Sequence, residues 1–431
     1  MTQTNGDLFE AVSSQAQTAK AAARVLSTLS TAQKNEVLLA MGDALLSSAN
    51  QILLANELDV QDAISNGQSD SRIDRLRLSH KRIEEMVSGL KQVVHLPDPV
   101  GERLSTRKRQ NGLVIDQIRV PLGVVAMIYE SRPNVTVDAA GLTLKTGNAV
   151  VLRGGKEALR TNSILVESLR KGLTQQGLPE GAIGFIDRPE RETVDMLIRM
   201  RGLIDLAIPR GGAGLISTVV ERALVPVIET GVGNCHVYVD RDADFQKATS
   251  IVINAKTQRP SVCNAIETLL VHESIASAFL PLIAADLIAK SVEIRGCEKT
   301  LAILQTLFNL HRDHIVPAQD EDFETEFSDL VLAIKVVHDE KEAIDHIDRY
   351  GTRHSEAIVS ENMVAAEEFL QQVDAAAVYH NASTRFTDGF EFGFGAEIGI
   401  STQKLHARGP MGLEALTSYK YVIRGDGQIR G

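Results

Sequence analysis

Apolar side chains in the first 95 or so residues recur at helical spacing. Ser30–Gln33 match the capping-box pattern that starts a helix, and Leu38, Met41 and Leu45 follow three and four residues apart. The same spacing returns farther along the chain, at Ile83, Met86, Val87, Leu90 and Val94. The pattern predicts a layer of helices that ends before Pro97 and Pro99.

Residues 102–120 read as a β-hairpin. Two strand-like runs flank Asn111-Gly112, and this dipeptide is the strongest short-range signal of a tight turn between strands. Such a ribbon has few partners within its own domain. We therefore expect it to reach another subunit, as an oligomerisation element of a homo-oligomer, or else the far domain.

From residue 123 onward, short apolar runs alternate with helix-length segments. The first series comprises residues 123–128, 148–153, 181–186, 203–208 and 225–229, and a second series begins after residues 234–240. This alternation is typical of a buried parallel sheet with right-handed crossovers. It predicts two parallel-sheet α/β domains, at 1–235 and 236–405. Residues 406–431 would pack with the hairpin or with the first domain.

Composition narrows the class of protein. The 431 residues carry 45 basic and 56 acidic side chains, a net charge of −11, so there is no general attraction for nucleic acid. The N-terminus lacks the pattern of a signal peptide, and no run approaches the ~18 apolar residues of a membrane span. The three cysteines are not spaced like a disulfide framework or a zinc site. We expect a cytoplasmic protein without a metal.

Cys263 is the first candidate for chemistry. It stands in the turn that joins a helix predicted over 242–257 to the strand 265–272, where a thiolate can attack an activated carbonyl. An isolated cysteine is more often a buried and inert one. Cys235 and Cys297 are expected to be structural.

Two polar residues follow predicted strands. The amide of Asn134, at the start of a helix, can donate a hydrogen bond to an oxyanion, although an N-cap is the ordinary role for such a residue. Glu229 closes the run 225–229 and can handle protons or position a cofactor, or it can be a surface glutamate in an ion pair.

Two strand-to-helix turns are candidates for a nucleotide site. Arg153-Gly154-Gly155-Lys156 offers two cations that suit a 2′-phosphate, but a solvated turn has the same composition. Arg210-Gly211-Gly212 ends the next strand without forming the G-x-G-x-x-G fingerprint, so a plain turn explains it as well.

Taken in order, these pieces resemble the aldehyde dehydrogenase superfamily. Residues 121–134 look like that family's strand and oxyanion asparagine, and residues 147–158 like its nucleotide turn. Residues 229–235 look like its glutamate and glycine pair, and residues 261–264 like its nucleophile motif. The resemblance implies a Rossmann-like cofactor domain and a catalytic domain. It also suggests Glu326 as a ligand of the cofactor ribose, although the glycine and proline that usually follow are missing.

One departure bears on the cofactor. Where the family's turn usually reads Lys-Pro-Ser-Glu, this chain has Arg153-Gly154-Gly155-Lys156, so Lys156 replaces a glutamate that would repel a 2′-phosphate. The resemblance therefore implies NADPH.

Residues 343–358, 381–389 and 401–421 resemble the branch of the superfamily that acts in proline biosynthesis. That likeness implies reduction of L-glutamyl 5-phosphate to glutamate 5-semialdehyde through a thioester on Cys263, with docking of glutamate 5-kinase as a further possibility. The anionic substrate needs local cations and hydrogen-bond donors, and the candidates are Arg132, Arg259, Asn381, Ser383, Thr384 and Arg385. Each of the three arginines has a structural ion pair as its alternative.

Two other functions stay open. One is an NAD(P)-dependent dehydrogenase of another acidic aldehyde. The other is an acyl hydrolase or transferase that pairs Cys263 with a histidine such as His272 and uses no nicotinamide.

Overall fold

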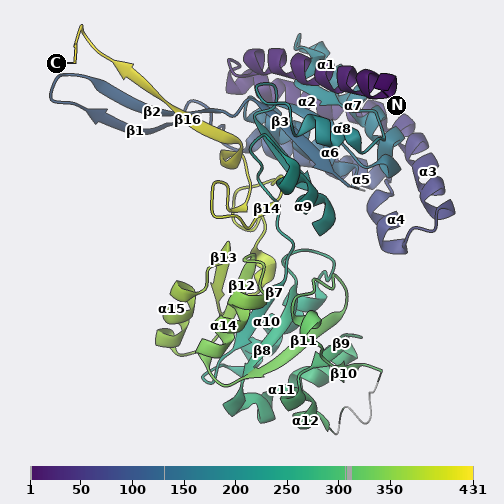
Figure 1. The fold of residues 1–431 in the computed structure, drawn as a ribbon, viewed down its shortest axis with the longest axis vertical. Helices are drawn as coiled ribbons and strands as arrows, with labels where there is room; N and C mark the ends of the chain where they lie inside the picture. The colour runs from purple at the N-terminus through teal and green to yellow at the C-terminus, as the bar shows by residue number, and fades with distance from the viewer. Residues whose placement is uncertain (1, 131, 306, 308–312, 431) are drawn as a thin grey trace. The chain divides into compact units, whose positions relative to one another are not determined.

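The computed structural model describes residues 2–130, 132–305, 307 and 313–430, which form two compact units (Figure 1). The first unit comprises Met1–Thr230, Gly393–Gly399 and Met411–Gly431. The second comprises Gly231–Phe392 and Ile400–Pro410. The division thus falls five residues before the predicted one, and residues 393–399 belong to the first unit rather than the second. Residues 393–399 join the first unit because Met411 of that unit makes backbone hydrogen bonds of 3.0 and 2.8 Å with Ile398 and Gly399.

The first unit begins with the predicted helical layer. The Ser30 side chain accepts a hydrogen bond from the Gln33 backbone, and the Gln33 side chain accepts one from Ser30, so the capping box is formed. Helix α2 packs against both α5 and α7. The apolar face of α5 ends at Val93 rather than at the predicted Val94. The helices are α1 (Thr2–Leu26), α2 (Thr31–Ser47), α3 (Ala49–Ser65), α4 (Asp70–Leu76) and α5 (His80–His95).

A four-stranded parallel sheet in the order β5-β4-β3-β6 forms the centre of this unit. Its middle strands are buried along their whole length, as their unbroken apolar runs require. The elements are β3 (Val124–Tyr129), α6 (Asn134–Lys145), β4 (Ala149–Arg153), α7 (Leu159–Gln175), β5 (Ile183–Phe185), α8 (Glu192–Leu197), β6 (Leu206–Arg210) and α9 (Ala213–Arg222). Short 3-10 turns lie at Lys156–Ala158 and Glu180–Ala182.

The strand predicted over 225–229 is wrong. Only one bridge forms there, between Val227 and Ala207. Ala207 donates to the carbonyl of Pro226, and Ile228 donates to the carbonyl of Ala207. To extend this parallel ladder toward the N-terminus of the segment, the backbone N–H of residue 226 would have to donate the next hydrogen bond. Residue 226 is proline, which has no N–H. Glu229 therefore lies in irregular chain just before the end of the first unit.

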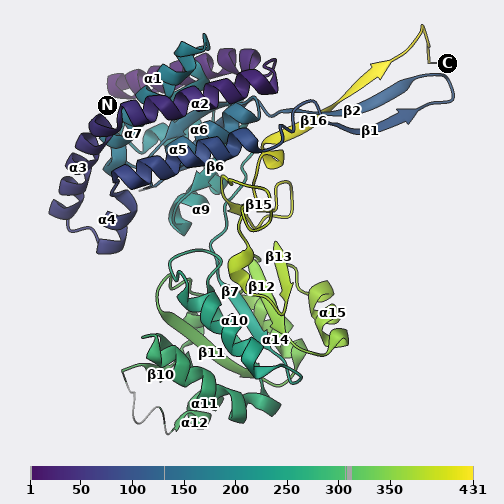
Figure 2. The same cartoon turned by 180° about the vertical axis from the view of Figure 1, so that it is seen from behind.

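The hairpin forms a separate antiparallel sheet with the C-terminal strand. Its order is β1 (Arg103–Lys108), β2 (Val114–Pro121) and β16 (Thr417–Arg424). Gly112 has φ +89°, a backbone conformation that favours glycine, and this explains why the turn uses Asn111-Gly112. Figures 1 and 2 show the three strands as a long ribbon that extends from the helical part of the same unit.

The second unit is built on a seven-stranded parallel sheet in the order β10-β9-β11-β8-β7-β12-β13. Alternate residues of its strands enter two cores. Val237 and Val239 pack with α10 and α11 on one face, whereas Tyr238 packs with α14 and α15 on the other. The strands are β7 (Cys235–Val239), β8 (Ile266–His272), β9 (Glu293–Gly296), β10 (Ile315–Pro317), β11 (Val331–Val337), β12 (Ser355–Val359) and β13 (Ala377–His380).

Helices cover both faces of that sheet. They are α10 (Phe245–Thr257), α11 (Glu273–Ala289), α12 (Glu298–Ile303), α14 (Glu340–Tyr350) and α15 (Met363–Gln372). Short 3-10 turns lie at Asp320–Phe323 and, in η4, at Thr384–Phe386, and the strands β14 (Ile400–Ser401) and β15 (Gly409–Pro410) pair with each other. A last 3-10 turn, at Glu414–Leu416, belongs to the first unit.

Candidate active site

Cys263 lies where the turn after α10 enters β8, at the amino-terminal edge of the second unit's sheet. Gly233 precedes β7 and therefore reaches the same edge. A Cβ added to Gly233 would stand 1.5 Å from the carbonyl oxygen of Cys263, so only glycine fits there. The Cys235 thiol also lies 3.2 Å from that oxygen. Both Gly233 and Cys235 thus restrain the Cys263 backbone, while the Cys263 side chain is half-buried.

The loop that carries four predicted substrate residues is fastened to the neighbour of the nucleophile. Thr384 Oγ1 donates to the Asn264 carbonyl at 2.7 Å. The Asn264 amide donates to the carbonyls of Thr387 at 2.8 Å and of Arg385 at 3.4 Å. Thr387 Oγ1 in turn bonds the hydroxyls of Ser355 and Tyr379. We call these bonds around Asn264 the Asn264 clamp.

The structure gives those four residues different surroundings. Thr384 is fully buried within the Asn264 clamp, and Ser383 is buried with its hydroxyl accepting from the Arg385 backbone. The Asn381 side chain bonds both backbone groups of Ser360, so it fixes the end of β12. A substrate contact by Thr384 is excluded in this conformation because none of its surface is exposed.

Arg385 is the member of this loop whose charge interacts with Cys263. Burial holds the pKa of its guanidinium below the ordinary value, and Arg259 has the same effect. The negative charges of a Cys263 thiolate and of Asp388 oppose this shift. Arg385 Nε donates to Gln258 Oε1 at 2.8 Å. The second unit thus brings the charge of one predicted cation, Arg385, to the candidate nucleophile, and a second predicted cation, Arg259, acts on Arg385.

Glu326 takes part in the same assembly. Its Oε1 accepts the backbone N–H of Gly233 at 3.1 Å, so it braces the glycine that abuts Cys263. Glu326 therefore belongs to the second unit, as the candidate nucleophile does, whereas the other predicted cofactor ligands belong to the first unit. Ser328, two residues on, has φ +54° where the family pattern expects glycine. Its N–H donates to the buried Glu267.

Asn134 starts α6 in the first unit with an exposed side chain. Its Nδ2 donates to Asp138 Oδ2 at 3.0 Å. Burial raises the pKa of Asp138 to about 6, against the lowering effects of the Asn134 hydrogen bond and of the Arg210 charge. Sequence reasoning missed Asp138, although its i+4 spacing from Asn134 on a helix could have revealed it. Arg132 is half-buried beside Asn134, and its carbonyl accepts from Val135.

At the predicted nucleotide turn, the two cations have different surroundings. The Arg153 side chain is buried and donates to the carbonyls of Gly154, Pro189 and Glu190. That guanidinium braces its own unit in this conformation, in contrast to its predicted role toward a phosphate. Lys156 is exposed.

The two glycines of this turn are also constrained. A Cβ on Gly154 would stand 2.3 Å from the Asn162 amide, and one on Gly155 would stand 2.1 Å from the Glu157 carboxylate. The absence of a Cβ therefore lets Glu157, which sequence reasoning overlooked, fold over the turn.

The turn at Arg210-Gly211-Gly212 already holds a carboxylate. Glu130 Oε2 accepts the Gly212 N–H at 3.0 Å at the start of α9. A Cβ on Gly211 would stand 2.7 Å from the same carboxylate. Glu130 therefore occupies the helix N-terminus where the prediction placed cofactor phosphate, and this residue too was missed from sequence.

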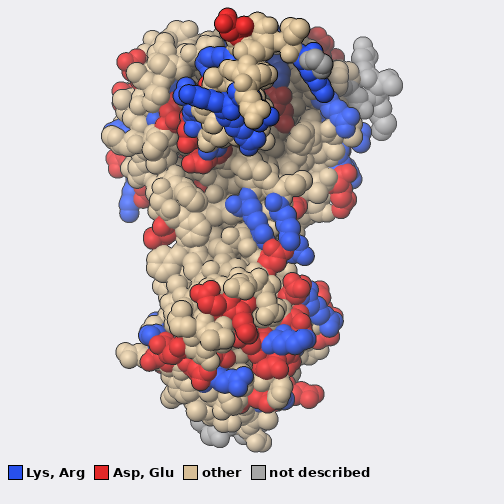
Figure 3. Space-filling model, turned by 90° about the vertical axis from the view of Figure 1, so that its left-hand side faces the viewer, with Lys and Arg blue, Asp and Glu red and all other residues tan. Residues whose placement is uncertain are grey.

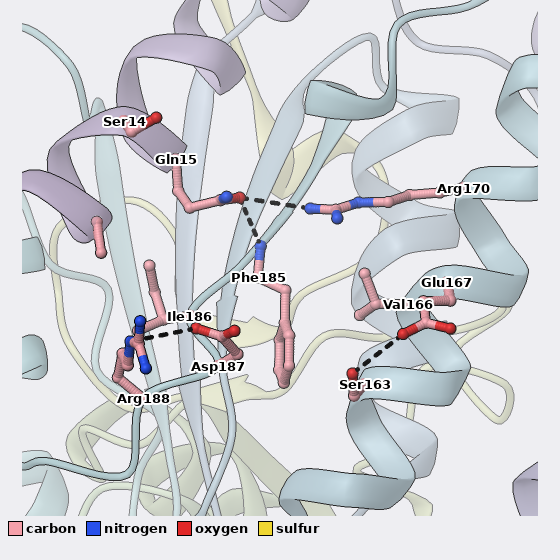
Figure 4. A pocket seen from close by; sticks show the side chains of 11 residues that line it. Ser14, Gln15, Ser163, Val166, Glu167, Arg170, Phe185, Ile186, Asp187 and Arg188 are labelled. Atoms are coloured by element: carbon pink, nitrogen blue, oxygen red, sulfur yellow. Dashed lines mark hydrogen bonds and ion pairs between the residues drawn. The ribbon is translucent and has the colours of Figure 1, made fainter.

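A surface hollow of about 300 Å³ in the first unit is lined by none of the predicted site residues (Figure 4). Gln15 accepts the N–H of Phe185, and Arg170 donates to the carbonyl of Ile183, at the edge strand β5. Side chains of α1 and α7 thus cover the open backbone groups of an edge strand, a known protection against pairing with another chain.

Charged side chains are distributed differently on the two units. Figure 3 shows basic side chains gathered over the hairpin of the first unit and both signs intermixed on the second unit. Across the described parts of the chain, no group of three or more His, Cys, Asp or Glu residues is arranged to hold a metal ion. No single described helix is long and apolar enough to span a bilayer, whereas α2 and α3, bent by 65°, meet that measure only as a pair.

Comparison with known proteins supplies independent information. A family model described as "Aldehyde dehydrogenase family" matches residues 6–295. Gamma-glutamyl phosphate reductase of Moorella thermoacetica is 59% identical over 97% of this chain and 98% of its own length, and that of Carboxydothermus hydrogenoformans is 58% identical over 96% and 98%.

Among solved structures, gamma-glutamyl phosphate reductase from Thermotoga maritima superposes with a TM-score of 0.94 at 49% identity, covering 98% of this chain and 100% of its own. An acetylating aldehyde dehydrogenase from Geobacillus thermoglucosidasius shares the fold, with a TM-score of 0.68 at 17% identity over 99% and 98% of the chains. The predicted resemblance and fold class are thereby confirmed.

Proposed function

The chain belongs to the aldehyde dehydrogenase family and, within it, to the γ-glutamyl phosphate reductases, and from this premise we propose that Cys263 carries the reduction of L-glutamyl 5-phosphate to L-glutamate 5-semialdehyde. The observation that carries the assignment is the half-buried thiol of the second unit, with which the charge of Arg385 interacts. A guanidinium near a thiol favours the thiolate and suits an anionic substrate.

The Cys263 sulfur attacks the acyl carbon, a C–S bond forms, and the C–O bond to phosphate breaks with its electron pair on phosphate. The product is a thioester. NADPH, which Gly154, Gly155 and Lys156 would help to hold, would supply the hydride that converts this thioester to the aldehyde level. The resulting hemithioacetal on Cys263 then releases the semialdehyde and restores the thiolate.

Asn134 is proposed to donate to the oxyanion of the intermediates, together with the backbone N–H of Cys263. The Asp138 carboxylate accepts one Nδ2 hydrogen of Asn134 at 3.0 Å, which orients the amide and leaves its second hydrogen for the oxyanion. Glu229 is proposed to handle protons or to position the cofactor. No water is activated in this reaction, so a role for Glu229 as a hydrolytic base does not apply.

The residues of the first unit fit a dinucleotide. Gly154 and Gly155 follow a parallel strand and precede a helix, the usual position of a nucleotide site, and the exposed Lys156 comes next. We propose NADPH rather than NADH on the charge of Lys156, since Arg153 is already bonded within the unit. Lys156→Ala should lower kcat/KM for NADPH about tenfold and leave that for NADH nearly unchanged. Equal losses with both nucleotides would remove Lys156 from the proposed 2′-phosphate site.

The ribbon of the first unit is also the proposed site of self-association. The outer strand β16 exposes Tyr419, Tyr421 and Ile423, a row of large apolar side chains on the ribbon, and we propose that it meets a second copy of the chain. A cytoplasmic site of action and docking of glutamate 5-kinase, which would shorten the path of a labile acyl phosphate, belong to the same proposal.

One assay tests the function. Glutamate 5-semialdehyde should reduce NADP only when inorganic phosphate is present, and Cys263→Ser should abolish this while NADPH binding, followed by fluorescence, is kept. Cys297→Ser is the matched control and should remain active. Turnover by Cys263→Ser near that of the control would disprove the nucleophile, and phosphate-independent turnover would favour another aldehyde dehydrogenase. Acyl-ester hydrolysis without nicotinamide would favour the hydrolase.

A further inference from the structure

Asn264, the residue after Cys263, positions Arg385. Through the Asn264 clamp, residues on both sides of Arg385 are bonded to Asn264: the Thr384 hydroxyl donates to its carbonyl, and the Thr387 carbonyl accepts from its amide. Thr384 is fully buried. The position of Arg385 relative to Cys263 is therefore set by short-range bonds within the second unit. A surface arginine on a free loop would have no such fixed relation to the sulfur.

The guanidinium is oriented as well as placed. Its Nε donates to Gln258 Oε1 at 2.8 Å, and this bond fixes the plane of the guanidinium. The N–H groups of the two terminal nitrogens can then bind an oxyanion in bidentate fashion. Asp388, the acidic residue that acts on Arg385, already accepts the backbone N–H groups of Phe390 and, at 3.4 Å, of Glu391. Arg259, next to Gln258 in the chain, adds an exposed second cation.

We propose that Arg385, with Arg259 as an outer cation, binds the phosphoryl group of the acyl phosphate, and inorganic phosphate in the reverse direction, rather than a carboxylate of the amino acid. This inference rests on the proposed function and names which anionic group of the substrate the cations at Cys263 recognise.

The connectivity of the substrate favours this assignment. The phosphorus is separated from the reacting carbonyl carbon by one oxygen atom, whereas the α-carboxylate lies beyond three further carbons. When the carbonyl carbon is placed for attack by the Cys263 sulfur, a cation that acts on that sulfur is therefore adjacent to the phosphoryl group.

Charge development points the same way. As the C–S bond forms and the C–O bond breaks, one negative charge moves onto the phosphate oxygen that leaves, and a proton from solvent later neutralises part of it. A fixed guanidinium at that position is more useful in the transition state than in the ground state. The α-carboxylate gains no charge during the reaction.

The test separates the two anionic groups kinetically, using the full chain. The rate of NADP reduction is measured with inorganic phosphate and glutamate 5-semialdehyde varied independently. Arg385→Ala should raise KM for phosphate by about 10-fold or more, the loss expected for a charged hydrogen-bond donor, and change KM for the semialdehyde by less than about threefold. Arg385→Lys keeps the charge without the planar fork and should fall between the wild type and the alanine variant.

Arg349→Ala removes a guanidinium that stacks on Tyr350 in the same unit and is the matched control, with both constants expected to be unchanged. A raised KM for the semialdehyde with an unchanged KM for phosphate would overturn the inference, and so would two unchanged constants. If the wild type shows no phosphate-dependent reaction at all, the proposed function fails rather than the assignment of Arg385.

A second measurement requires neither cofactor nor aldehyde. Iodoacetate, an anionic reagent, should alkylate Cys263, as followed by mass spectrometry of its peptide, and inorganic phosphate should slow this in the wild type but not in Arg385→Ala. Arg385→Lys keeps the test decisive if the alanine variant folds poorly. No protection by phosphate in the wild type, or equal protection in the variants, would refute a phosphate site.

Discussion

Gly233→Ala tests whether the backbone of Cys263, the proposed nucleophile, is held as tightly as the structure indicates. The added Cβ would lie 1.5 Å from the Cys263 carbonyl oxygen, 2.3 Å from its carbon and 2.7 Å from its Cα. Real Cβ atoms essentially never approach within 3.0 Å, so the separation from that oxygen must grow by at least 1.5 Å. The atoms that obstruct are backbone, and no side-chain rotation can relieve the overlap.

The expected cost follows from that displacement. Moving a catalytic group by about 1 Å can lower turnover about 10²-fold, whereas overpacking of this kind typically costs ~1–3 kcal/mol of stability. We expect Gly233→Ala to remain folded at 25 °C and to lose about two orders of magnitude in kcat for phosphate-dependent NADP reduction. Alkylation of Cys263 should change in rate as well, since the turn that carries it has moved.

Gly231→Ala is the matched control, two residues earlier. Its Cβ would stand 2.2 Å from Cγ2 of Thr402, a side-chain atom that can rotate away. We expect a loss of less than about tenfold. Near-normal kcat in Gly233→Ala, or equal losses in the two variants, would refute the view that the close approach of Gly233 positions Cys263.

Two further predictions concern buried charges. Lys256 and Glu267 form a fully buried ion pair at 2.5 Å, and burial lowers the pKa of Lys256 and raises that of Glu267 to about 7. Lys256→Met should therefore cost ~3–5 kcal/mol in urea unfolding, and Lys256→Met with Glu267→Gln should recover part of it, whereas additive losses would contradict a coupled pair. Asp138 has a folded pKa of about 6, above the ordinary value, so its ionisation destabilises the fold as pH rises through 6. Asp138→Asn should accordingly raise Tm more at pH 8 than at pH 5 and remove any loss of kcat below about pH 6. An acid limb unchanged in this variant would show that another group causes it.

Much of the fold could be predicted from the sequence because caps, turns and strands depend on interactions between residues close together in the chain. The capping box at Ser30 and the turn at Asn111-Gly112 depend on residues three or four apart, and both formed as expected. The central strands of both sheets are unbroken apolar runs, which burial on two faces requires. The strand predicted over 225–229 failed at Pro226, where one missing N–H outweighed the apolar pattern.

The site was less predictable, because burial and partners decide what a polar side chain does. Arg153 and Lys156 looked equivalent in the sequence, yet three backbone carbonyls hold the first inside the unit and leave the second exposed. Glu130 gave no warning of its role, since its partner Gly212 is 82 residues away in the chain, whereas Asp138 lies four residues from its partner Asn134 on one helix.

By itself, the sequence determined the two parallel-sheet domains, the hairpin and the residue types needed for thioester chemistry, since periodicity, turn chemistry and motif order are properties of neighbouring residues. Only the tertiary structure decided which of those residues surround the thiol. Gly233 and Arg385 are far from Cys263 in the chain. Gly233 abuts the Cys263 backbone and Arg385 is bonded to the neighbouring Asn264, through contacts of a few ångströms that no local pattern encodes.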